Sequence, residues 1–131
     1  MTQQFFDKCM EQHAIWRAKR VEGARADFSN KCLHDINMQG YCMAGARIEG
    51  ADFSGAIINW DDHHVIAELL RQAAGGRIDR INKIKDIRFG CNQASCWDDY
   101  ITGFDANFVT WAQGILRNYV KAGDNAHEFI T

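Results

Sequence analysis

Residues 26–60, ADFSNKCLHDINMQGYCMAGARIEGADFSGAIINW, decide the fold expected for this chain. Taken in fives from Ala26, the stretch divides into ADFSN, KCLHD, INMQG, YCMAG, ARIEG, ADFSG and AIINW. The central residue of each five is large and apolar, and the residue two before it is mostly small. The seven centres are Phe28, Leu33, Met38, Met43, Ile48, Phe53 and Ile58. A period of five fits neither a helix nor a strand, so it predicts a repeat structure.

The units ADFSN (26–30) and ADFSG (51–55) carry a resemblance to a known family. They resemble the pentapeptide-repeat family, whose pattern is roughly Ala-Asp/Asn-Leu/Phe-Ser/Thr-Gly, although Lys31 and Tyr41 stand where a small residue is expected. In that family each five residues form one side of a right-handed square coil, with the centre and the small residue pointing inward. The resemblance implies that residues twenty apart stack at about 4.8 Å. It places Asp27 beside Arg47 on the outer surface.

So short a coil cannot bury its own ends. Seven sides make about 1.75 turns, and a solenoid of that length needs caps. We therefore expect a mixed fold in one domain, 1–131: an N-terminal helix in 1–23, a pentapeptide-repeat β-coil in 26–60 and a helical region in 61–131. The first helix has Thr2 as N-cap and Gly23 at its end, with an apolar face. That face carries Phe5, Phe6, Cys9, Met10, His13 and Trp16.

About four helices are expected in the C-terminal region. The first begins at Asp61 or Asp62 and stops at Gly75-Gly76, the second covers roughly 78–88, and the third begins near Ser95. The last spans 105–121 and has the best amphipathic pattern in the chain, with Phe108, Trp111, Ala112, Ile115, Leu116, Tyr119 and Val120 on one face. The stretch from Trp60 through Gly75, with Cys96 to Asp99, looks like the tail of uncharacterised bacterial and phage pentapeptide-repeat proteins. That similarity implies a phage or mobile-element origin.

Composition excludes several classes of protein. The 131 residues suit one domain, 47% of them are apolar, and a formal charge of -2 gives no basic footprint for nucleic acid. The start of the chain lacks the basic and then apolar run of a signal peptide, and no stretch has the length of a membrane span. Five cysteines without a secretory signal favour free thiols in a reducing compartment. We expect a cytoplasmic protein, in the host cytosol if it is phage-encoded.

No arrangement of residues in the sequence predicts catalysis, a cofactor or a metal. His63 and His64 are adjacent, so on a helix they diverge by about 100° and cannot converge on one ion. Cys91 and Cys96 have no second cysteine pair nearby, and no histidine and acid stand where they would activate a thiol. The expected function is therefore non-catalytic.

The function expected from these features is stoichiometric binding or inhibition of another protein, a host protein if the origin is a phage. The candidate binding surface consists of five outward-facing residues of the repeat, Asp27, Asp35, Arg47, Glu49 and Asp52, and of Tyr41, which is too large for its inward slot and is expected to swing out. Two alternatives stay open. One is a DNA-mimic inhibitor of a nucleic-acid-binding complex, which the short coil and its few carboxylates disfavour; the other is a metal-dependent enzyme. Direct nucleic-acid or membrane binding is not expected, and end-to-end pairing into a homodimer is an alternative to complete capping.

Overall fold

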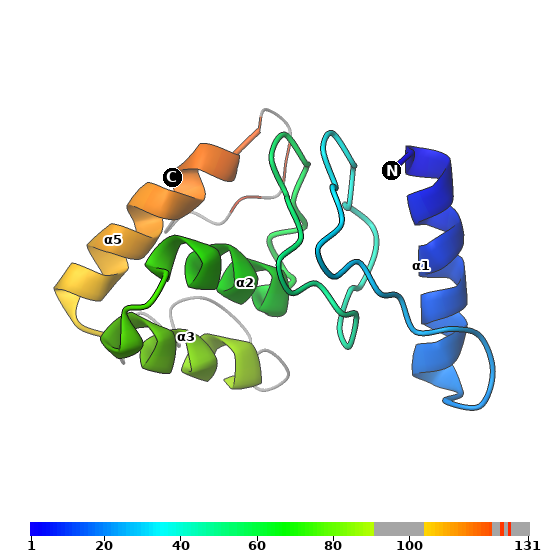
Figure 1. The fold of residues 1–131 in the computed structure, drawn as a ribbon, viewed down its shortest axis with the longest axis horizontal. Helices are drawn as coiled ribbons and strands as arrows, with labels where there is room; N and C mark the ends of the chain where they lie inside the picture. Colours follow the sequence, from blue (N-terminus) through cyan, green and yellow to red (C-terminus); the bar gives the residue numbers. More distant parts are fainter. Residues whose placement is uncertain (91–103, 122–123, 125, 127–131) are drawn as a thin grey trace. The chain divides into compact units, whose positions relative to one another are not determined.

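The computed structural model describes residues 1–90, 104–121, 124 and 126, and the chain divides into two compact units, Met1–Asn59 and Trp60–Thr131 (Figure 1). Across these described residues the regular secondary structure is helical: four α-helices and one short 3-10 helix. None of these helices is both long enough and apolar enough to cross a bilayer.

Helix α1, Gln3–Ala18, opens the first unit. The hydroxyl of Thr2 accepts the amide of Phe5 at 3.1 Å, so the predicted N-cap is confirmed. The helix ends at Ala18, five residues before the predicted end, and turns follow. Three residues of the predicted apolar face are buried, Phe6, Met10 and His13, whereas Phe5 is 56% exposed.

Residues 26–59, called here the turn segment, follow the five-residue period through their turns and their burial. The backbone is left-handed once in every five residues, at Asn30, Asp35, Gly40, Gly45, Gly50 and Gly55. All seven central residues of the predicted units are buried, none more than 2% exposed. The period of five therefore corresponds to one turn and one buried side chain per unit.

Backbone hydrogen bonds join residues of the turn segment that lie about twenty apart in the chain. The amide of Phe28 donates to the carbonyl of Arg47 at 2.7 Å, and the amide of Arg47 donates to Ala26 at 3.0 Å. Similar pairs of bonds give three isolated parallel bridges: Asp27 with Arg47, Cys32 with Asp52, and Asn37 with Ile57. The expected placement of Asp27 beside Arg47 is confirmed.

The predicted fold class, a right-handed pentapeptide-repeat β-coil or β-helix capped by helices, is wrong, because none of the described residues forms a strand. Each bridge involves one residue on each side, and a turn separates it from the next bridge. A strand requires consecutive paired residues, and a turn in every five residues prevents them. The fold of the described residues is helical, with a turn segment whose loops are joined by single bridges.

In the second unit, helix α2, His63–Ala74, lies where it was predicted, between Asp62 as N-cap and Gly75 as C-cap. It contacts both α3, Ile78–Gly90, and α5, Ala106–Leu116, which continues into the 3-10 helix η1, Arg117–Tyr119. Its apolar residues Val65, Ile66, Leu69 and Leu70 are buried. The helix predicted near Ser95 lies outside the described residues.

The last predicted helix is shorter than expected. The carboxylate of Asp105 accepts the amide of Phe108 at 2.9 Å and so caps the start of α5, as predicted. The α-helix ends at Leu116 instead of 121. Phe108, Ala112 and Leu116 are its buried residues, and their spacing of four places them on one face against α2.

Candidate functional site

The candidate binding surface predicted from the sequence remains on the outside of the turn segment, with one qualification. Its five charged members, Asp27, Asp35, Arg47, Glu49 and Asp52, are exposed. Tyr41 is only half-buried, and its hydroxyl donates to Asp7 of α1 at 2.6 Å. That bond lowers the pKa of Asp7 and raises the pKa of Tyr41. Tyr41 thus joins α1 to the turn segment within the first unit.

Two carboxylates of this surface are held by their own turns. Asp27 and Asp52 each accept the amide of the residue two positions on, Ser29 and Ser54, at 3.0 Å. Bonds from Ser54, and then from His34, lower the pKa of Asp52 to about 2. Bonds from Ser29, with a smaller effect from Arg47, lower the pKa of Asp27 as well. Both side chains are therefore ionised and oriented at neutral pH.

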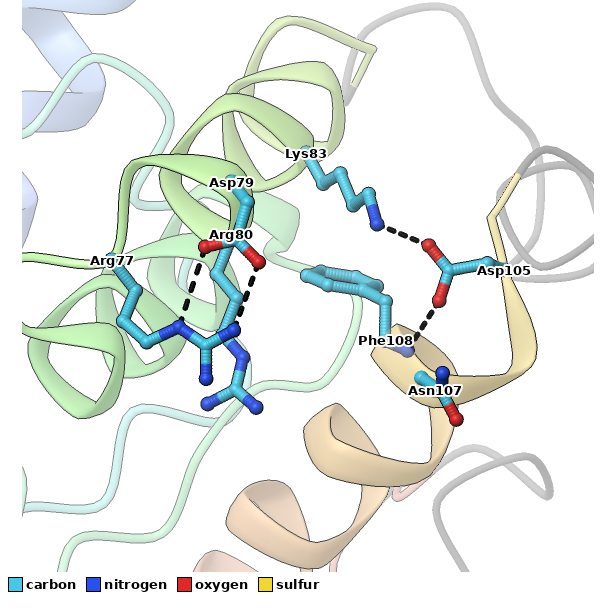
Figure 2. A pocket seen from close by; sticks show the side chains of 7 residues that line it. All are labelled: Arg77, Asp79, Arg80, Lys83, Asp105, Asn107 and Phe108. Carbon is cyan, nitrogen blue, oxygen red and sulfur yellow. Dashed lines mark hydrogen bonds and ion pairs between the residues drawn. The ribbon is translucent and has the colours of Figure 1, made fainter.

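A hollow of about 310 Å³ lies in the second unit, between the start of α3 and the start of α5 (Figure 2). Because its lining is mostly charged, we call it the charged hollow. The lining residues are Arg77, Asp79, Arg80, Lys83, Asp105, Asn107 and Phe108. The first four come from α3 and the residue before it, and the other three come from the N-terminal end of α5.

Ion pairs hold two of the three cations of the charged hollow. The guanidinium of Arg77 reaches both carboxylate oxygens of Asp79, at 3.0 and 3.3 Å. The ammonium of Lys83 pairs with Asp105, the same carboxylate that caps α5 (Figure 2). These contacts lower the pKa of Asp79 and of Asp105, so both carboxylates stay ionised.

The third cation, Arg80, has an aromatic partner. Its guanidinium lies 4.4 Å from the centre of the Trp111 ring, and no carboxylate in the described part of the chain pairs with it. Three cations against two carboxylates leave the lining with a formal charge of +3 − 2 = +1. The N-terminal ends of two helices add positive partial charge. The hollow therefore favours an anionic group.

A second cluster lies on the turn segment and is called here the thiol cluster: Cys32, His34 and Asp52. The ring nitrogen Nε2 of His34 lies 2.8 Å from Oδ2 of Asp52, and the ligand atoms of all three residues lie within 4.8 Å of one another. Sequence reasoning nominated only Asp52. The twenty-residue offset from Cys32 to Asp52 was the available signal, because it places the two residues side by side.

The histidines and cysteines that the sequence did not favour as a metal or catalytic site lie elsewhere. His63 is buried and His64 half-buried at the start of α2. Cys91 and Cys96 lie outside the described residues. The charged hollow was not predicted, because the convergence of the Arg and Lys residues of 77–85 with Asp105 depends on how α3 and α5 pack.

Comparison with known proteins gives no match to a family model, to a curated protein or to a solved structure. The identification as a pentapeptide-repeat protein is therefore wrong on two grounds. No family model matches, and the described part of the turn segment has single bridges where a β-coil would have strands.

Proposed function

We propose that the protein acts by stoichiometric, non-catalytic binding of another protein, and that the charged hollow receives an acidic segment of that partner. The observation that carries the proposal is the guanidinium of Arg80, which has no carboxylate partner among the described residues and lies in a hollow of net positive lining. An arginine fork matches a carboxylate with two parallel hydrogen bonds, so an Asp or Glu side chain is the complementary group.

The neighbours of Arg80 support a peptide in preference to a free small anion. Trp111 is half-buried beneath the guanidinium, and the ring of Phe108 lies 5.6 Å from the ammonium of Lys83. Phe108 is buried, so it is the half-buried Trp111 ring that gives a bound segment apolar contact as well as charge. A phosphate or other compact anion would gain no apolar contact from the Trp111 ring.

An enzymatic role has less support. The charged hollow contains no nucleophile beside a general base, since its lining residues are arginines, a lysine, carboxylates, an amide and a phenylalanine. The DNA-mimic alternative has little support, because its carboxylates have basic neighbours: Asp27 lies beside Arg47, and Asp52 pairs with His34. A cytosolic location agrees with the free thiols of Cys9, Cys32 and Cys42.

The test is capture of partners by immobilised full-length protein, with Arg80→Glu as the variant and Arg20→Glu as its matched control. Arg20 also lies over a tryptophan, Trp16 at 4.0 Å, but belongs to the first unit. We expect a captured protein whose affinity falls at least about tenfold with Arg80→Glu, stays unchanged with Arg20→Glu, and weakens as salt rises.

Titration of the chain with the captured protein should saturate at a fixed molar ratio. Mutation of an acidic segment in the captured protein should lower the affinity as Arg80→Glu does. The proposal fails if capture is insensitive to Arg80→Glu. Loss of nucleic-acid-binding proteins upon Asp27→Asn and Asp52→Asn, with no effect of Arg80→Glu, would favour the DNA mimic instead.

A further inference from the structure

We propose that the thiol cluster, Cys32, His34 and Asp52, is a binding site for one Zn²⁺ ion on the outer surface of the turn segment. The site lies in the first unit, and it does not depend on the function proposed for the charged hollow in the second.

The backbone brings two of the ligands together. Cys32 and Asp52 face each other across a parallel bridge, closed on either side by the bonds from Leu33 to Asp52, 2.8 Å, and from Asp52 to Lys31, 2.9 Å. Side chains of bridged residues leave the backbone in the same direction, so the thiol and the carboxylate emerge side by side. Their proximity is therefore a property of the fold.

The turn after Cys32 supplies the third ligand. Asp35 has φ 61°, so the chain bends sharply just beyond His34. The imidazole of His34 points back to Asp52, with Nε2 at 2.8 Å from Oδ2. Asp52 in turn is oriented by Ser54, whose amide and hydroxyl donate to Oδ1 at 3.0 and 2.6 Å. Such outer hydrogen bonds fix a ligand carboxylate in place and leave its other oxygen available.

The distances fit a tetrahedral ion after small side-chain rotations. Ligand atoms around tetrahedral zinc lie about 3.3–3.8 Å apart, given bonds of about 2.0–2.3 Å. The three ligand atoms here are within 4.8 Å of one another, and the closest pair is 2.8 Å apart. The side chains of His34 and Asp52 are about half exposed, 51% and 52%, so they have room to move.

The donor set selects the metal. A thiolate, an imidazole and a carboxylate suit zinc, whereas magnesium and calcium prefer oxygen alone. Three protein ligands leave a fourth position for water. A catalytic reading of the same residues is weaker, because no hydrogen bond joins Cys32 to His34 in the described structure, so the thiol has no base in contact.

Calorimetric titration of the full-length protein with ZnCl₂, and absorption spectra with CoCl₂, test the site. The matched control is Cys42→Ser, since Cys42 is an exposed thiol ten residues along the same segment. We expect one equivalent of zinc and a thiolate-to-cobalt charge-transfer band for the wild type and for Cys42→Ser. Cys32→Ser should lose the band, and Cys32→Ser, His34→Gln and Asp52→Asn should each weaken zinc binding more than about tenfold.

Two further measurements make the outcome unambiguous. Zinc should protect Cys32 from alkylation by iodoacetamide and leave Cys42 reactive, and circular dichroism should show that the surface variants stay folded. Binding that survives Cys32→Ser but disappears in a Cys91→Ser, Cys96→Ser double variant would overturn the proposal. An absence of binding by folded wild-type protein would overturn it too. Arg80→Glu should leave zinc binding unchanged, so this test and that of the charged hollow fail separately.

Discussion

The two units of the chain bury their interiors by different means. In the first, one large apolar side chain is buried in every five residues, and hydrogen bonds between loops twenty residues apart set the register. In the second, α2 is buried along most of its length against α3 and α5, with helical spacing. The difference determines which side chains come close together. In the first unit they lie at bridged positions, as Cys32 and Asp52 do. In the second they lie at the starts of helices, as Arg80 and Asp105 do.

The units also differ in how they hold a buried titratable side chain, as His13 in the first and Glu68 in the second show. His13 in the first unit is fully buried and uncharged, because its Nδ1 accepts the amide of Ala26 at 3.0 Å while its Nε2 donates to Ala44 at 2.9 Å. Glu68 in the second is 4% exposed and charged, and it accepts two bonds from Arg71, at 2.7 and 2.6 Å. His13 is therefore held as an uncharged imidazole and Glu68 in an ion pair, so the two side chains respond differently to pH.

The largest effect is expected from emptying the interior of the first unit. Phe28 is 1% exposed and stacks on Phe6 at 5.2 Å, so Phe28→Ala should lower the free energy of unfolding by about 3–5 kcal/mol. Val21→Ala, at a residue 94% exposed, is the control and should change it by less than about 0.5 kcal/mol. Urea titration gives these values.

Hydrogen exchange locates the effect of Phe28→Ala. The amides of Leu33 and Arg47, which bond between loops, should lose protection before those of α2. Equal loss in both places would show that the two units unfold as one, and the contrast between them would not extend to their stability.

The sequence predicted the elements that depend on local chemistry. Thr2, Gly75 and Asp105 are the caps of α1, α2 and α5, because a cap needs only its own side chain or backbone and the adjacent turn. The apolar centres from Phe28 to Ile58 predicted burial correctly for the same reason: one side of each unit faces inward. Local patterns predicted these caps and buried centres, but not the C-terminal ends of α1 and α5, which come earlier than expected.

Most predictions that required contacts between distant residues failed, although the placement of Asp27 beside Arg47 was correct. Apolar periodicity cannot distinguish a ladder of strands from single bridges separated by turns. The prediction of a β-coil was therefore wrong, although the prediction that its apolar centres are buried was right. Arg80 and Asp105 share a hollow only because α3 and α5 both pack near α2. For the thiol cluster, the offset from Cys32 to Asp52 was visible in the sequence, but the direction of His34 depends on a left-handed turn at Asp35.

A smaller effect should appear as a dependence of stability on pH in the first unit. Burial, opposed by the bond to Ala44 and reinforced by Arg17, Arg25 and Arg20, lowers the pKa of His13 below its ordinary 6.5. The unfolded chain then binds more protons than the folded one below pH 6.5. The stabilisation due to neutral His13 is thus complete above pH 6.5 and is lost as the pH falls through the folded-state pKa.

Urea titrations of wild type and His13→Gln across this range measure the effect. Because glutamine does not titrate, the variant should have the shallower slope of unfolding free energy against pH, and the protection of the amide of Ala26 should fall with pH only in the wild type. Parallel slopes would mean that the imidazole is not held neutral, and the contrast with Glu68 would lose its basis.

The smallest effect distinguishes the turns of the two units. Gly40 has φ 85° with no heavy atom within 4 Å of the site of a Cβ, so Gly40→Ala adds left-handed strain and no clash, and it should cost about 1 kcal/mol. Gly76, in the turn after α2, has equal space and no left-handed backbone. Gly76→Ala should therefore stabilise the chain by about 0.5 kcal/mol, through the reduced freedom of the unfolded state.

Asparagine tolerates the left-handed conformation, as Asn30 does with φ 59°, so Gly40→Asn should cost less than Gly40→Ala. Thermal unfolding of the three variants checks the order, and equal costs for alanine at positions 40 and 76 would show that the corner at Gly40 does not require its left-handed backbone.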